Sequence, residues 1–379
     1  MKIIYLSSYL PRQCGIASFT DWLMSAVKKE NPVIQQSVIA INETDCQQRK
    51  YPKIVIQQFN QADEDAFKTI AAFINNSGAD LFCLQHEFGL YGRNYGKLIV
   101  ELLKRVKIPT ITFLHTIPVL PRAKRRLSYL KLIKKMSRYS AAMVTTSLQG
   151  KRALRHNNIP ANKIFMLPHG ALTMPFKNKQ KLNPRKIRLF TYGLIAKSKG
   201  LHFAVSAMET IVVRYPQAKY IIAGAPHPIN AKNRERDYYE SLRQQVIDKH
   251  LEKNVKFFQH YLTEKQIISS LLKTDIALLP YLSKAQISSG IIANAMAAGT
   301  CVVSTPFTYA QDMIGRDGQR GYYIKFADAE SISQVVIKLI RKPTNILRVS
   351  KAAHQFGCQF TWKQTAKKFI AIMKSVKRG

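Results

Sequence analysis

The chain has 379 residues, of which 46% are hydrophobic and 10% aromatic, so it can bury large cores and is not a disordered chain. A chain of this length is too long to fold around one ordinary hydrophobic core, which predicts two domains of roughly 150–200 residues each. The net charge is +37, from 59 Lys and Arg against 22 Asp and Glu. Five cysteines without a Cys-x-x-Cys pair argue against a disulfide framework or a zinc site and fit a reducing compartment.

The beginning of the chain reads as a strand of about seven residues, which is too short and poorly flanked for a secretory signal. No apolar run approaches the roughly 20 residues that a membrane-spanning helix needs. These two observations predict a cytoplasmic protein.

The first half of the chain alternates between apolar runs and helical patterns. The expected strands are 3–8, 37–41, 54–58, 81–86, 110–115, 142–146 and 164–168. The expected helices are 16–29, 66–75, 96–105, 121–138 and 148–156. Such alternation predicts a parallel sheet with helices on both faces.

A polar, basic stretch with two prolines, residues 171–186, reads as a linker, and the alternation then resumes. The second set of strands is 187–192, 220–223, 255–259, 276–280, 301–304 and 322–325. Helices are expected at 201–213, 264–273 and 287–298, and an amphipathic helix at 361–377. Two such units in series predict a cleft between them, with ligands beyond the carboxyl ends of the strands.

Polar residues follow several of the expected strands in the first half. The first strand ends in a loop with Gly15, another runs into His86 and Glu87, and a third ends at His115. A loop before a helix can hold phosphate because the helix start offers free N–H groups. His169 and His227 also follow strands, and we expect only one or two of these histidines to contact a ligand.

The second half contains two further phosphate-binding candidates. Lys199 lies at a junction between a loop and a helix, and Ser288, Ser289 and Gly290 precede a helix of small residues. Either serine could cap that helix, and its free N–H groups could receive a diphosphate. The alternative is a small-residue helix that only packs against the sheet.

The stretch 63–65, Asp-Glu-Asp, matches the Asp-x-Asp pattern that some sugar-nucleotide enzymes use for a divalent ion. Here it opens a helix, where acidic residues stabilise the positive end of the dipole in any case. We therefore expect no metal site.

The basic residues are concentrated in one window. Between Leu102 and Met208 there is no Asp or Glu, while 23 Lys and Arg occur. Within it, residues 121–139 carry eight Lys and Arg around an apolar stripe of Leu127, Leu130, Ile133 and Met136. Such a helix could lie on an anionic membrane surface, or it could pack in the first domain with a solvated basic face.

The succession of PRQCGIASFT, LQHEFGLYG, FLHTIP, KIFMLPHG, FTYGLIAKSKG, ALLPYLSKAQISSG and AMAAGTCVVSTP resembles glycosyltransferase family four over nearly the whole chain. The resemblance implies the GT-B fold, with two Rossmann-like domains, and a retaining enzyme that uses a nucleotide-sugar donor without a bound metal or cofactor. It places an N-terminal, acceptor-side domain at 1–175, a linker at 176–186 and a C-terminal, donor-side domain at 187–358. The last helix, 359–379, would cross back to the first domain.

The resemblance also implies roles for individual residues. Gly15 would approach the donor phosphates or sugar, His115 would contact the donor sugar, and Lys199 would neutralise the diphosphate. The catalytic set would be His115, Lys199 and Gln286. The donor-binding set would be Gly15, Gly193, Lys199, Ser288, Ser289, Gly290 and Asn294, and His86 and Glu87 would lie on the acceptor side.

Three positions depart from the family pattern. Many members have two glutamates where this chain has Gln286 and Asn294, and an arginine where it has Leu194. Amide oxygens accept hydrogen bonds from sugar hydroxyls more weakly than carboxylates do. The chain would thus be a divergent branch of the family, or one with reduced or absent activity.

The leading hypothesis is transfer of a sugar from a nucleotide-diphosphate sugar to a glycan or lipid-linked acceptor, in polysaccharide biosynthesis at the inner face of the plasma membrane. The alternative is a non-catalytic protein on the same scaffold that binds polyanions or membranes, which the charge of +37 favours. Nucleic acid is a less favoured partner, because binding to a charged nucleic-acid backbone would not require the polar residues at the strand ends.

Overall fold

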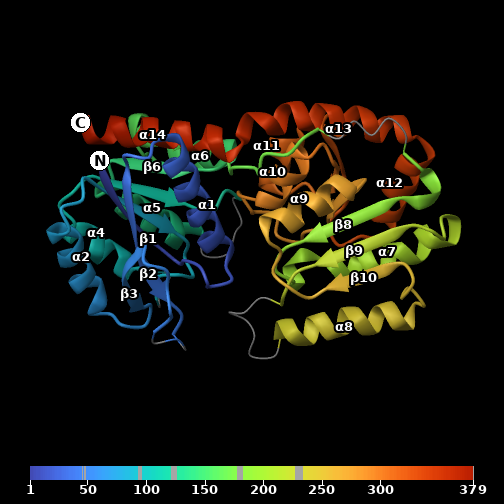
Figure 1. Cartoon of the computed structure of the whole chain (residues 1–379), viewed down its shortest axis with the longest axis horizontal. Helices are drawn as coiled ribbons and strands as arrows, with labels where there is room; N and C mark the ends of the chain where they lie inside the picture. Colours follow the sequence, from blue (N-terminus) through green and yellow to red (C-terminus); the bar gives the residue numbers. More distant parts are fainter. Residues whose placement is uncertain are drawn as a thin grey trace. The chain divides into compact units, whose positions relative to one another are not determined.

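A computed structural model describes residues 1–44, 46, 48–92, 96–120, 126–176, 182–226 and 234–378. The chain divides into two compact units, each described here by itself (Figure 1). Unit 1 comprises Met1–Gly170 and Trp362–Gly379, and unit 2 comprises Ala171–Thr361. The division falls after Gly170, so the stretch expected as a linker, 176–186, belongs to unit 2, and the last helix joins unit 1.

Unit 1 is built on a seven-stranded sheet in the order β3-β2-β1-β4-β5-β6-β7, and all of its strand pairs are parallel. Its strands are β1 (Lys2–Ser7), β2 (Gln35–Asn42), β3 (Val55–Asn60), β4 (Leu81–His86), β5 (Thr110–Leu114), β6 (Ala142–Thr145) and β7 (Ile164–Met166). The central strands are apolar on both faces because helices cover both sides of the sheet.

The helices of unit 1 include one from the far end of the chain. They are α1 (Gly15–Glu30), α2 (Ala66–Asn76), α4 (Leu98–Arg105), α5 (Arg126–Arg138), α6 (Leu148–His156) and α14 (Trp362–Arg378). The last of these, α14, packs along α1, and Trp362 meets the Phe19 ring at 5.2 Å between centroids. The C-terminal segment thus completes the core of unit 1.

Unit 2 is built on a six-stranded parallel sheet in the order β10-β9-β8-β11-β12-β13. Its strands are β8 (Arg188–Tyr192), β9 (Lys219–Ala223), β10 (Val255–Phe258), β11 (Ile276–Leu279), β12 (Cys301–Ser304) and β13 (Gly321–Tyr323). Its helices are α7 (Leu201–Arg214), α8 (Arg234–Asp248), α9 (Glu264–Lys273), α10 (Gly290–Ala297), α11 (Thr308–Ile314), α12 (Ala329–Arg341) and α13 (Pro343–Gly357).

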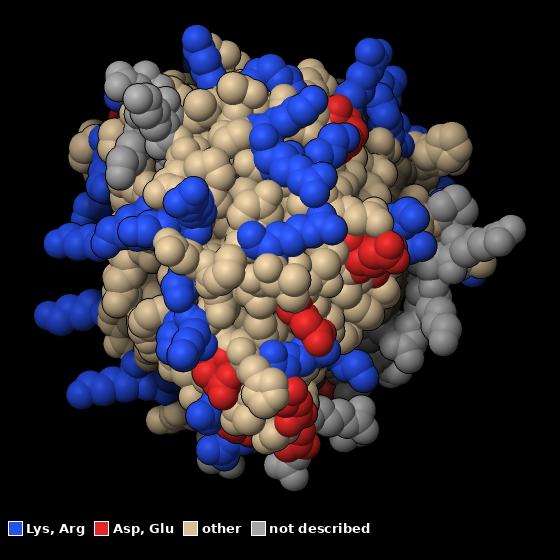
Figure 2. Space-filling model, turned by 90° about the vertical axis from the view of Figure 1, so that its right-hand side faces the viewer, with Lys and Arg blue, Asp and Glu red and all other residues tan. Residues whose placement is uncertain are grey.

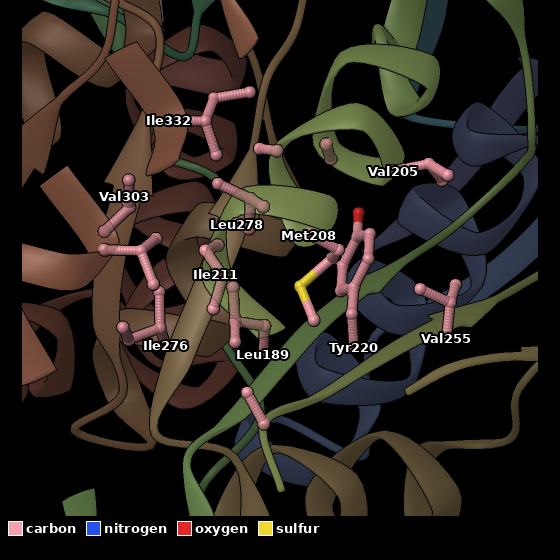
Figure 3. Close-up of a cluster of buried hydrophobic side chains, with 14 of the residues drawn as sticks. Leu189, Val205, Met208, Ile211, Tyr220, Val255, Ile276, Leu278, Val303 and Ile332 are labelled. Atoms are coloured by element: carbon pink, nitrogen blue, oxygen red, sulfur yellow. The ribbon is translucent and has the colours of Figure 1, made fainter. Parts of the chain in front are cut away.

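One core of unit 2 lies between its sheet and the helices α7 and α12 (Figure 3). Leu189, Ile276 and Val303 from three strands meet Met208 of α7 and Ile332 of α12 there, and all are at most 2% exposed. Burial of this apolar surface is the main stabilising contribution to the unit. Two parallel-sheet α/β domains, as the sequence predicts, are confirmed.

Helix α5 gives its apolar stripe to the core of unit 1. Leu130, Ile133 and Met136 are buried, whereas Leu127 is 70% exposed. Residues 121–125 of the expected helix lie outside the described part of the chain. Over Arg126–Arg138 the structure therefore agrees with the second alternative, a helix that packs in the first domain and has a solvated basic face. Three of the four residues of its apolar stripe are buried and not available to a membrane surface. No described helix combines the length and the apolar character needed to span a bilayer.

Candidate functional site

The strand order of unit 2 reverses beside β8, which has β9 on one side and β11 on the other. Chain connections leave β8 and β11 in opposite directions at this point, so the loops that follow them diverge. In parallel α/β sheets, such a switch point is where ligands bind, beyond the carboxyl ends of the strands. Lys199 and the 288–290 turn lie on the two segments that follow these strands.

The loop after β8 is held against the end of β11. Gly200 has a φ of +63°, and a Cβ at this position would lie 2.1 Å from the carbonyl oxygen of Pro280. The N–H of Leu282 donates to the carbonyl of Ser198 at 2.8 Å. Only glycine fits this left-handed, crowded position, so it brings the Lys199 segment onto the β11 loop.

Lys199 rests on an aromatic ring, with its Nζ 3.8 Å from the centroid of Tyr281. Burial lowers the pKa of this lysine to about 8, because the charged form loses solvation. Among the described residues no carboxylate forms an ion pair with Lys199. A desolvated ammonium without a counter-charge is suited to an anionic ligand.

Tyr281 is a site residue that the sequence analysis missed. Its ring is fully buried and stacks on Phe307 at 5.3 Å between centroids. The available signal was its place two residues after the end of β11, at the switch point. The position of Lys199 above its face could not be deduced from the spacing in sequence.

The turn before α10 presents a helix start at this site. Ser289 is extended, with φ of −156°, and its hydroxyl accepts from the N–H of Ile292, so the helix begins at Gly290 and not at residue 287 as expected. A Cβ added to Gly193, whose φ is +112°, would lie 3.0 Å from Cδ1 of Ile291. The close approach places Gly193 against the first turn of α10.

Gln286 and Asn294 form hydrogen bonds within unit 2. The side-chain amide of Gln286 donates to the carbonyl of Ser288 at 2.8 Å. Asn294 is 1% exposed, accepts from the N–H of Leu172 at 2.8 Å and donates to the hydroxyl of Tyr192 at 2.9 Å. Gln286 therefore shapes the turn, and Asn294 ties α10 to β8, whereas their expected contacts with the donor stay predictions.

In unit 1 the strand order reverses between β1 and β4. Gly15 is the first residue of α1 after β1, and a Cβ added to it would meet no atom within 4 Å. Arg12, in the same loop, is 2% exposed, with its Nε 2.9 Å from the Glu43 carboxylate, and its Nη1 donates to the carbonyl of Ile41. This arginine therefore anchors the loop to β2.

His86 and Glu87 follow β4 and differ in their surroundings. His86 is fully buried, and neither ring nitrogen has a hydrogen-bond partner among the described residues. The Glu87 carboxylate accepts from the Thr116 hydroxyl at 2.5 Å and from the N–H of Phe88 at 3.0 Å. Burial raises the pKa of Glu87 and lowers that of His86 to about 3. The structure therefore keeps His86 neutral and orients Glu87.

His115 follows β5, and its Nε2 lies 2.8 Å from the side-chain oxygen of Gln85. Burial lowers its pKa to about 3, so the ring is neutral at physiological pH. His169 packs against Phe19 and Trp362 as part of the core of unit 1. His227 lies outside the described residues.

The stretch 63–65 serves the start of α2. The Asp63 carboxylate accepts from the N–H of Ala66 at 3.0 Å, and Asp65 pairs with Lys68 at 3.0 Å. Within the part of the chain that the structure describes, no group of three His, Cys, Asp or Glu side chains has the arrangement of a metal site.

Residues 174–356, nearly all of unit 2, match the family model described as Glycosyl transferases group 1. The whole structure is similar to HepE from Anabaena in complex with UDP-glucose, with a TM-score of 0.75 and 14% identity, covering 99% of this chain and all of that one. The chain has the GT-B fold. No curated protein matches this sequence.

Two other GT-B structures are similar over the same extent. Sucrose-phosphate synthase from Thermosynechococcus elongatus has a TM-score of 0.75 at 14% identity, with 99% of both chains covered. A structure from E. coli, described as trehalose-6-phosphate bound with UDP-2-fluoro glucose, has a TM-score of 0.68 at 12% identity, again over 99% of both chains. The GT-B architecture expected from the sequence resemblance is therefore confirmed.

Proposed function

We propose that this protein transfers a sugar from a nucleotide-diphosphate sugar to a glycan or lipid-linked acceptor, with retention of the anomeric configuration. The observation that carries the proposal is the Lys199 ammonium, held over Tyr281 at the switch point of unit 2. The match of unit 2 to glycosyl transferases group 1 and the UDP-sugar complexes of similar structures support it.

The chemistry requires negative charge to be stabilised as the sugar leaves the diphosphate. Lys199 would pair with the diphosphate, and the free N–H groups at the start of α10, next to Ser289 and Gly290, would donate to its oxygens. Both groups are fixed before the ligand binds, so little reorganisation is needed as charge develops. With no metal proposed, these groups carry the electrostatic work of the donor site.

On the acceptor side, the residues of unit 1 supply neutral groups and one carboxyl. His115, held by Gln85, would donate or accept a hydrogen bond to the donor sugar without a charge. Glu87 would contact the acceptor, whereas the fully buried His86 would not. The acceptor hydroxyl would attack the sugar on the face that the diphosphate leaves, and its proton would pass to the departing diphosphate. That route gives retention without a side-chain nucleophile.

The substituted positions predict a changed donor preference rather than a lost donor site. Leu194 replaces a cation, so Lys199 and the α10 amides would hold the diphosphate without that arginine. Gln286 and Asn294 keep amide groups where carboxylates are common in the family. Both amides form hydrogen bonds to the main chain that hold the local structure in place. We place the reaction in the cytoplasm, with the products entering polysaccharide synthesis.

The test is incubation of the full-length protein with UDP-, GDP- and ADP-sugars, followed by detection of the released nucleoside diphosphate. We expect release from one class of donor, and an α-linked sugar product from an α-linked donor by NMR. An inverted linkage would refute retention alone. Absence of donor turnover, together with salt-sensitive binding of polyanions, would support the non-catalytic alternative.

A further inference from the structure

A second binding groove lies on the outer surface of unit 2, between α7 and α12. These two helices pack side by side over the same face of the sheet, and the groove between them has a volume of about 750 Å³. Because α7 follows β8 and runs back along a parallel sheet, its C-terminal end lies at the edge opposite the strand ends that carry Lys199. The groove is therefore separate from the donor site.

Four cations gather where the two helices end. Arg214 is the last residue of α7, Lys338 and Arg341 lie in the last turn of α12, and Lys342 follows directly. All four are exposed, and none forms an ion pair within the described part of the chain. Cations are favourable at helix C-termini, but four in one groove leave an uncompensated positive charge.

The acidic residue of the groove lies away from these cations. Glu330 is in the first turn of α12, where it accepts from the side chain of Gln334 at 2.9 Å. It thus leaves the cations at the other end of the helix unneutralised. Figure 2 shows Lys and Arg spread over much of the face of the molecule that it presents, with fewer Asp and Glu, most of them in its lower half.

The remaining groove residues have the chemistry of a carbohydrate site. Hydroxyl and amide side chains line it from both helices and beyond: Ser206, Thr210, Ser333, Gln334 and Asn345. Ala207 and Ile337 are buried beneath them and offer an apolar floor. Sugar hydroxyls pair with such polar groups, and the C–H faces of sugar rings pack on apolar floors.

The lining also distinguishes between polyanions. Single-stranded nucleic acids are usually held by aromatic side chains on which bases stack, in addition to cations. Of the residues that the structure describes, none that lines this groove is aromatic. The combination of cations, hydroxyls and amides without aromatic rings favours a chain of sugars that carries carboxylate, phosphate or sulfate groups.

We propose that the groove between α7 and α12 binds a segment of an anionic glycan. The cations at the helix ends pair with its acidic groups, and Ser206, Thr210 and Gln334 form hydrogen bonds with its hydroxyls. This binding does not depend on sugar transfer, since none of its residues belongs to the donor site. It would hold an acidic polysaccharide on the same unit that is proposed to bind the donor.

The test compares two full-length variants that lose four positive charges each. The groove variant carries Arg214→Gln, Lys338→Gln, Arg341→Gln and Lys342→Gln. The matched control carries Lys131→Gln, Lys134→Gln, Lys135→Gln and Arg138→Gln, which are exposed on α5 of unit 1. The probe is a fluorescent galacturonate hexasaccharide, with maltohexaose as the neutral counterpart, measured by anisotropy at physiological salt.

We expect the groove variant to bind the galacturonate probe at least tenfold more weakly than the wild type, and the control less than twofold more weakly. Equal losses in both variants would show attraction to diffuse charge and overturn the proposal. Failure of the wild type to bind the galacturonate probe would also overturn it. The same holds if a single-stranded RNA oligomer binds the groove more tightly than the galacturonate probe does. Circular dichroism verifies folding, and unchanged donor turnover in the groove variant separates this result from failure of the proposed function.

Discussion

At the scale of the residue, Lys199 combines the charge that is proposed to bind the donor diphosphate with a cost in stability. Its folded pKa of about 8 lies below the usual 10.5, since burial disfavours the ammonium. The folded protein therefore binds fewer protons than the unfolded chain between about pH 8 and 10.5, so this group makes unfolding harder as pH rises through that window. At pH 7 the desolvated charge is a net cost.

Replacement of Lys199 by methionine should therefore stabilise the protein while it impairs donor binding. We expect the free energy of unfolding at pH 7 to rise by about 1–2 kcal/mol, because the loss of the contact with Tyr281 offsets part of the relieved desolvation. Urea unfolding followed by circular dichroism measures the change. Lys197→Met, at an exposed position two residues away, should change it by less than about 0.5 kcal/mol. A Lys199→Met protein less stable than the wild type would assign the lysine a structural role.

The same pKa predicts a pH dependence of donor use. Below about pH 8 Lys199 is protonated and can pair with the diphosphate, and above it the charge is lost from the free protein. We expect kcat/KM for the donor to fall about tenfold per pH unit above that value. In Lys199→Arg the guanidinium stays charged, so the high-pH decline should move upward, even if the rate at its plateau is lower. An unchanged decline in this variant would assign the titration to another group.

At the scale of the element, strands were predictable because a buried parallel strand is apolar on both faces. The bounds expected for β4 and β12 agree with the structure, whereas α10 begins three residues later than expected. Apolar Ile287 extends the helical pattern in the sequence, but the extended Ser289 caps the helix. The role of Asn294 was beyond prediction, because its partners Leu172 and Tyr192 are remote in sequence.

The contact between Gly170 and α14 gives a prediction for one element. A Cβ at Gly170 would lie 2.2 Å from the indole ring of Trp362, which packs against Phe19 and Trp22. Gly170→Ala should displace this indole and lower the stability of unit 1 by about 1–3 kcal/mol. Tryptophan fluorescence during urea unfolding measures it, since the two tryptophans of the chain both lie in unit 1.

Gly89→Ala is the control for this prediction, because a Cβ there would meet nothing within 4 Å. We expect its unfolding midpoint to stay close to that of the wild type. If Gly170→Ala unfolds at the same urea concentration as Gly89→Ala, the packing of Trp362 in unit 1 is not as described.

At the scale of the whole molecule, the alternation of strands and helices predicted two parallel units without any structure. The return of α14 to unit 1 came only with the family resemblance, since an amphipathic pattern does not say which core its apolar face covers. The burial of the α5 stripe shows the same limit: the pattern of Leu130, Ile133 and Met136 fits a membrane surface as well as a protein core. Their partners are set by tertiary packing.

Three histidines of unit 1 with lowered pKa values predict how the protein responds to acid. The pKa values are about 3 for His86 and His115 and about 4 for His169, because burial disfavours the charged ring. The unfolded chain therefore takes up protons first as pH falls below about 6.5, and unit 1 loses stability until the folded values are reached. Between pH 7 and pH 5 we expect a loss of roughly 1–2 kcal/mol for each histidine.

Tryptophan fluorescence at each pH reports this loss from unit 1. His169→Gln removes one of the titrating rings and should reduce the slope of stability against pH by about a third, even though the variant is less stable overall. A slope that is the same in both proteins would contradict the assignment of acid sensitivity to these rings.

Unit 2 is proposed to bind the diphosphate of a nucleotide sugar through Lys199. The most direct measurement is isothermal titration of the full-length protein and its Lys199→Met and Lys197→Met variants with UDP-, GDP- and ADP-sugars. We expect one donor class to bind the wild type and Lys197→Met alike, and to bind Lys199→Met at least tenfold more weakly. Equal affinity for all three proteins, or no binding of any donor by the wild type, would contradict it.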